Sequence, residues 1–89
     1  MKESEILTSA IMVFGEKAQE EVAIEELAEL IQAISHKHRG RKDNIAEEIA
    51  DVEIMLEQLK IINHCYKEVE KIHKEKIKRL YDRIFKQCL

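Results

Sequence analysis

The chain contains no proline and only two glycines, Gly15 and Gly40, among its 89 residues. Proline and glycine are the residues that most strongly disfavour a helix interior, so their scarcity favours long helices over strands and turns. Around the two glycines, apolar residues recur at intervals of three and four, the spacing of one helix face. The sequence therefore predicts an all-α fold with a turn near each glycine.

The apolar pattern divides the chain into four expected helices. The first ends at Gly15, the second covers about residues 16–38, and the third begins after a polar turn with a cap from Asp43 or Asn44. The second helix has an apolar face of Ile24, Leu27, Ile31 and Ile34. The third has Ile45, Ile49, Val52, Leu56 and Leu59, and the fourth has Val69, Ile77, Leu80 and Ile84. The short turn at Gly40 makes the second and third helices antiparallel neighbours. Residues 1–89 are thus predicted to form one all-α domain, a four-helix bundle.

The small size of the chain limits the core that it can build alone. A domain of this length buries only roughly 60–65% of the surface that its unfolded chain exposes. We therefore expect oligomerisation, as a dimer or a larger assembly, to complete the bundle.

Composition also narrows the class of protein. The net charge of −3 gives no field strong enough to indicate a partner such as duplex DNA. No stretch approaches the roughly 18 consecutive apolar residues of a membrane span, and the first residues do not resemble a secretory leader. Cys65 and Cys88 lack metal-site spacing and are expected to be free thiols. We expect a cytoplasmic protein without a membrane partner.

Two acidic clusters with nearly the same spacing are the strongest indication of function. They are Glu25-Glu26-x-x-Glu29 on the second expected helix and Glu47-Glu48-x-x-Asp51 on the third. Residues three apart share a helix face, so each cluster can direct two carboxylates at one point. Antiparallel packing would bring four carboxylates together, and such a group is unfavourable unless protons or cations neutralise it. Oxygen ligands without cysteine or histidine select Mg²⁺ or Mn²⁺.

The helical register separates the members of the two clusters. Glu48 falls inside the apolar sector of the third helix, where an unpaired carboxylate costs several kcal/mol. Asp51, Glu26 and Glu29 fall at the margins of the apolar faces. We therefore predict that the metal ligands are Glu26, Glu29, Glu48 and Asp51. Glu25 and Glu47 turn further toward solvent and are predicted to be catalytic, as additional ligands or as a base that orients water.

At these residues the chain resembles the MazG-like nucleoside triphosphate pyrophosphohydrolases of the all-α NTP pyrophosphatase superfamily. The resemblance covers about residues 14–59 and is carried by Gln19, by Glu25-Glu26-Leu-Ala-Glu29-Leu30 and by Glu47-Glu48-Ile-Ala-Asp51-Val52. It implies a Mg²⁺-dependent enzyme that hydrolyses a nucleoside triphosphate, an NTP or dNTP, to the monophosphate and pyrophosphate. It also implies assembly as a homodimer or a homotetramer.

Positive groups should then face the phosphates of the substrate. Lys76, Arg79 and Arg83 form one stripe on the last expected helix, and the family commonly has a lysine and an arginine in this region. They are predicted to bind phosphate. Arg39, Arg41 and Lys42 in the turn form a second candidate patch.

Two other interpretations remain open. A carboxylate-bridged di-iron bundle needs a Glu-x-x-His on each of two helices, and only Glu70 and His73 fit that pattern. The chain could instead be a non-catalytic helical oligomer, an interaction or regulatory module whose acids pair with basic residues of a partner helix. That alternative predicts no dependence on divalent cations.

Overall fold

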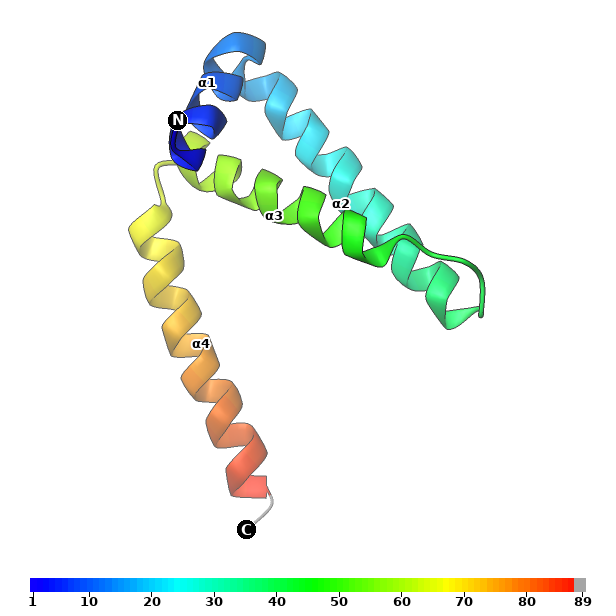
Figure 1. Ribbon diagram of the computed structural model, residues 1–89. Coiled ribbons are helices and arrows are strands. Elements are labelled where there is room, and N and C mark those ends of the chain that lie inside the picture. Colours follow the sequence, from blue (N-terminus) through cyan, green and yellow to red (C-terminus); the bar gives the residue numbers. More distant parts are fainter. Residues whose placement is uncertain (88–89) are drawn as a thin grey trace.

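A computed structural model describes residues 1–87 and shows four helices joined by short turns (Figure 1). The helices are α1 (Glu3–Phe14), α2 (Glu16–His38), α3 (Ile45–Ile62) and α4 (Tyr66–Gln87). Residues 1–87 contain no strand, which confirms the predicted all-α class with four helices. In this described part of the chain, no helix is long and apolar enough to cross a membrane.

Both glycines lie at turns, as the sequence predicts. Gly15, between α1 and α2, has a φ of 95°, and Gly40, after α2, has a φ of 69°. These values lie in the region that residues with a Cβ rarely adopt, so glycine permits both turns without steric strain. The α1–α2 turn is closed by the Gly15 amide, which donates a hydrogen bond to the Ile11 carbonyl at 2.8 Å.

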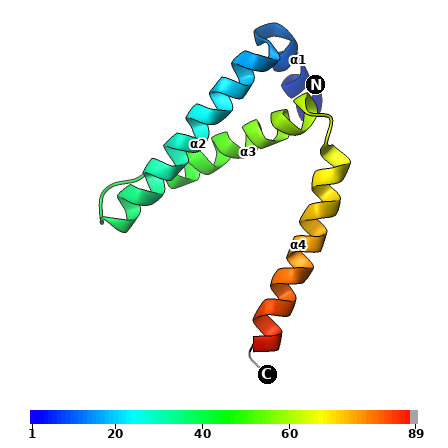
Figure 2. The ribbon, with the colours of Figure 1, turned by 180° about the vertical axis from the view of Figure 1, so that it is seen from behind.

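Helices α2 and α3 form an antiparallel hairpin, and α1 packs across the end of it that is distant from the Gly40 turn (Figures 1 and 2). The core of this three-helix unit is small. Its buried apolar side chains are Leu7 and Ile11 from α1, Ala23 and Ala33 from α2, and Val52, Met55 and Ile62 from α3. The unit therefore has little buried apolar surface beyond the α2–α3 seam.

The face by which the hairpin closes differs from the face that the apolar pattern suggests. Val52 is buried as expected, but Ile49 and Leu56 on α3 are exposed. On α2 the exposed apolar side chains are Ile24, Leu27, Ile31 and Ile34. The two helices meet along Ala23 and Ala33 because small side chains let helix axes approach closely. The stripe of Ile24, Leu27, Ile31 and Ile34 on α2 therefore faces solvent.

Helix α4 extends away from the three-helix unit and contacts it through α3 (Figure 1). The radius of gyration is 16.5 Å, and the molecule measures 53 × 37 × 24 Å. A compact domain of this length has a radius of gyration of about 12 Å. The side chains of residues 70–81 and 83–86 are all exposed. Completion of the bundle by oligomerisation stays a prediction.

Candidate metal site

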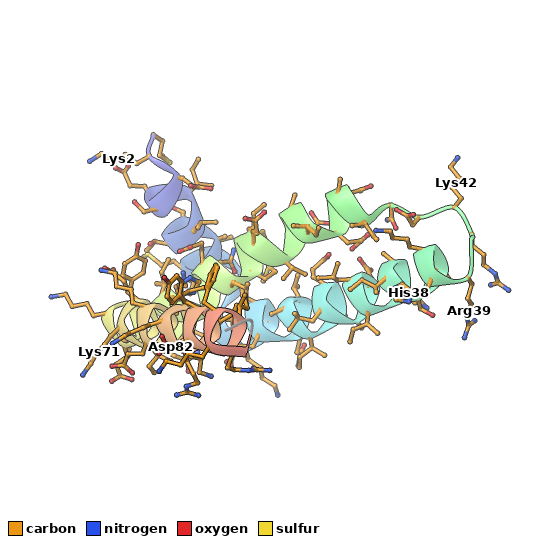
Figure 3. All side chains as sticks on the ribbon, turned by 90° about the horizontal axis from the view of Figure 1, so that it is seen from below. Lys2, His38, Arg39, Lys42, Lys71 and Asp82 are labelled. Carbon is orange, nitrogen blue, oxygen red and sulfur yellow. The ribbon has the colours of Figure 1, made fainter. Side chains whose placement is uncertain are left out.

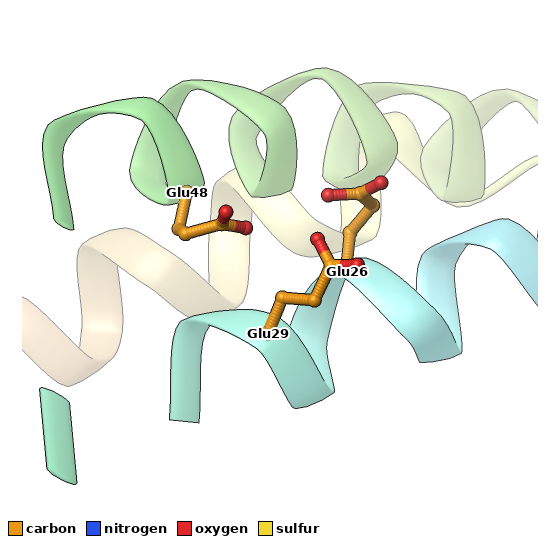
Figure 4. A group of neighbouring side chains, drawn as sticks. All are labelled: Glu26, Glu29 and Glu48. Carbon is orange, nitrogen blue, oxygen red and sulfur yellow. The ribbon is translucent and has the colours of Figure 1, made fainter. Parts of the chain in front are cut away.

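Three carboxylates from the two acidic clusters converge across the α2–α3 seam. Glu26 and Glu29 project from successive turns of α2, and Glu48 projects from α3 toward them (Figure 4). One oxygen from each of the three side chains lies within 4.8 Å of the other two. The i,i+3 spacing on α2 and the antiparallel packing of α3 produce this arrangement, as the sequence predicts.

Glu48 is the most buried member of the group, with 6% of its surface exposed. Its Oε1 accepts a hydrogen bond of 2.7 Å from the Asn44 side-chain amide. Its Oε2 is buried and has no hydrogen-bond partner among the described residues, and the same holds for Oε2 of Glu26. A buried carboxylate oxygen without a partner is costly, so each of these two atoms is suited to accept a proton or a cation.

The environment of the group disfavours negative charge. Burial, together with the charges of Glu29 and Asp51, raises the pKa of Glu26 from 4.5 to about 7. Burial also raises the pKa of Glu48, as does the neighbouring charge of Glu29, while the hydrogen bond from Asn44 lowers it. The acids therefore lie close enough to repel one another when ionised. A divalent cation bound among the carboxylates would relieve this repulsion. Without a cation, protonation of one carboxylate relieves it.

The remaining acidic residues of the two clusters lie near the group but outside it. Asp51 is half-buried one turn beyond Glu48, and its charge raises the pKa of both Glu26 and Glu48. Glu25 and Glu47 are exposed. The structure thus brings together three of the four predicted ligands and places Asp51 beside them. The catalytic roles of Glu25 and Glu47 stay predictions.

The predicted phosphate-binding residues are not part of this arrangement within one chain. Lys76, Arg79 and Arg83 are exposed on α4, which contacts the rest of the molecule through α3. The turn residues Arg39, Arg41 and Lys42 are exposed as well, and Figure 3 shows Arg39 and Lys42 at the far end of the hairpin. Neither basic group meets the acids in the structure of a single chain.

The spacing of the three carboxylates suits a small divalent cation. Mg²⁺ binds oxygen ligands at about 2.1 Å, so two ligands of one ion lie about 3–4 Å apart. Small rotamer changes would bring oxygens within 4.8 Å of one another to that separation. The set contains only carboxylates, which favours Mg²⁺ or Mn²⁺ over zinc or copper.

Two polar residues near the seam have roles that the sequence pattern did not reveal. A cap of α3 was expected from Asp43 or Asn44; the Asn44 side chain makes no capping bond and instead donates to Glu48. Asp43 accepts the bond from the Ile45 amide at 3.2 Å. The i,i+4 spacing of Asn44 and Glu48 was the one sequence feature that could have indicated this hydrogen bond. Gln58 is 4% exposed on α3, and its Oε1 has no partner among the described residues.

Comparisons of the chain with protein-family models, curated proteins and solved structures gave no significant match. The case for the site therefore depends on the geometry of Glu26, Glu29 and Glu48 and on the motif that contains them.

Proposed function

We propose that the protein is a Mg²⁺-dependent nucleoside triphosphate pyrophosphohydrolase. The observation that carries this proposal is the buried Oε2 of Glu48, which has no partner among the described residues and belongs to a group that includes Glu26 and Glu29. A carboxylate kept in this environment is better explained as a ligand than as a solvated surface acid. The motif around these residues, with its resemblance to MazG-like enzymes, supports triphosphate as the substrate.

The three acids would act by holding divalent cations at the seam, with Asp51 as a further ligand at its margin. A bound cation supplies charge neutralisation for the triphosphate and lowers the pKa of a coordinated water. Asn44 holds the Glu48 carboxylate in place through its 2.7 Å hydrogen bond. Glu25 and Glu47, which are exposed and directly precede Glu26 and Glu48 in the chain, are the candidates for the base that orients water.

The test is pyrophosphate release from a panel of NTPs and dNTPs, with Mg²⁺ and with chelator. The proposal predicts Mg²⁺-dependent release by the wild-type protein and none by Glu48→Gln. Glu20→Gln changes an exposed acid of α2 outside both clusters and should keep the wild-type rate. Mg²⁺ should also raise the melting temperature of the wild-type protein, because a ligand that binds only the folded state stabilises it. No release from any substrate would refute the hydrolase proposal.

A non-catalytic oligomeric module is the second candidate, and the exposed apolar faces of α2 and α4 favour it. Large exposed apolar patches commonly mark interaction sites. This alternative predicts that Mg²⁺ does not change the melting temperature and that no nucleotide is hydrolysed. The measurements above therefore separate the two functions.

A further inference from the structure

A groove of about 1050 Å³ lies between α1, α3 and the first half of α4, on the opposite side of α3 from the acidic seam. Apolar side chains from α3 and α4 line it, among them Ile54, Leu56, Ile61 and Val69. Three carboxylates line it as well, those of Glu3, Glu53 and Glu57, against one ammonium, that of Lys60, which pairs with Glu57 at 3.0 Å. The lining thus keeps an excess of negative charge. The groove therefore suits an occupant that is apolar along one face and positively charged beside it.

The second half of the chain's own α4 does not reach this groove. The first half of that helix supplies part of the groove wall through Tyr66, Val69 and His73. The corner between α3 and α4 has defined geometry: the Cys65 amide donates to the Lys60 carbonyl at 3.1 Å, and the Lys60 Nζ lies 5.3 Å from the centre of the Tyr66 ring. An occupant must therefore come from another molecule.

The second half of α4 has the chemistry that the groove requires. Ile77, Leu80 and Ile84 form an apolar stripe, and all three are about half exposed. Lys76 and Arg83 each precede a stripe residue by one position, about 100° around the helix, and so flank the stripe. Nothing in the described part of the chain covers these residues.

The distribution of charge supports pairing between copies. Residues 66–89 contain eight basic and four acidic residues, a net charge of +4. Residues 1–65 contain seven basic and fourteen acidic residues, a net charge of −7. Opposite charges on two surfaces favour their association and select its orientation. The helix that extends into solvent is thus complementary to the body of another copy.

We propose that the second half of α4 from a second copy of this chain occupies the groove between α3 and α4. Ile77, Leu80 and Ile84 pack against the apolar lining, and Lys76 and Arg83 face Glu53 and Glu57. The exchange is reciprocal, because a two-fold axis gives each copy the same pair of surfaces. Two chains then interlock as a closed dimer. This inference does not depend on hydrolase activity, and it assigns two of the three predicted phosphate-binding residues to the interface.

The test is an exchange of charge between the two surfaces, read by native mass spectrometry and sedimentation. One variant carries Glu53→Lys and Glu57→Lys, and the other carries Lys76→Glu and Arg83→Glu. Each variant alone places like charges together at both contacts, so its self-association should weaken at least ten-fold. In a mixed dimer both contacts pair opposite charges. Refolding the two variants together should therefore produce the mixed dimer in excess of the statistical half.

A wild-type monomer would overturn the proposal, as would variants that dimerise alone as well as the wild type. A refolded mixture that stays monomeric would also overturn it. Circular dichroism establishes that each variant is folded. As a second perturbation, Leu80→Asp should dissociate the dimer. A dimer that survives Leu80→Asp but dissociates with Ile31→Asp would place the interface on the exposed face of α2 and refute the insertion of α4 into the groove of the other copy.

Discussion

Binding of Mg²⁺ to the three carboxylates should depend on pH, because the ion competes with a proton on Glu26. The pKa of this carboxyl is raised to about 7, so the group is largely protonated at pH 6 and largely ionised at pH 8. A metal ligand must be deprotonated, and the apparent dissociation constant therefore scales with one plus the ratio of protonated to ionised carboxyl. That factor is about 11 at pH 6 and about 1.1 at pH 8. We expect Mg²⁺ affinity to fall at least about ten-fold between pH 8 and pH 6.

Isothermal titration calorimetry in two buffers of different ionisation enthalpy measures both the affinity and the protons released. We expect release of about 0.9 proton per site from Glu26 at pH 6 and about 0.1 at pH 8. Glu48, whose pKa is also raised, adds to the release in the same direction. Glu20→Gln should retain the pH dependence, since Glu20 is exposed and outside the group. Equal affinities at the two pH values, or binding without proton release, would refute the reasoning.

Three further predictions concern Glu26, Glu48 and Gln58. Without metal, protonated Glu26 should stabilise the folded state fully below pH 4.5, and this contribution should be lost as the pH rises through about 7, because the folded state binds the proton more tightly than the unfolded state does. Chemical denaturation should therefore show a flatter pH dependence of the unfolding free energy for Glu26→Gln than for the wild type. Glu48→Gln should abolish turnover while its metal-free melting temperature stays at or above that of the wild type, since one charge is removed and Asn44 can still donate to the new amide oxygen; a large fall in melting temperature would instead indicate a structural role. Gln58→Met should raise the unfolding free energy by about 1 kcal/mol, because a buried oxygen without a partner is removed; calorimetry should detect this as roughly 4–8 °C in melting temperature, and destabilisation would show that the amide is satisfied.

Much of the fold and the seam could be predicted from local patterns. The positions of Gly15 and Gly40 indicated where helices end, and both glycines have positive φ. The spacing of the acids along α2 and α3, with a short turn between them, predicted the convergence of Glu26, Glu29 and Glu48. These features depend on helix periodicity and on chain connectivity, which a single sequence contains.

The buried face of α2 and the direction of α4 could not be predicted in this way. Ala23 and Ala33 contribute little to an apolar pattern, yet they form the contact because of their small size. The direction of α4 depends on the corner after α3, where His64 has a φ of 51°, a conformation uncommon for residues other than glycine. The corner is a local helix cap in which the His64 amide donates to the Ile61 carbonyl and the Cys65 amide donates to the Lys60 carbonyl. Glycine usually occupies the position of His64 in such a cap, so no feature of the sequence indicated it.

The central claim, that Glu26, Glu29 and Glu48 hold a divalent cation, is tested most directly by anomalous diffraction from crystals containing Mn²⁺. The account predicts an anomalous peak in the α2–α3 seam at bonding distance, about 2.1 Å, from oxygens of these three side chains. The peak should be absent from crystals of Glu48→Gln grown under the same conditions. A wild-type map without a peak in the seam at saturating Mn²⁺ would contradict the claim.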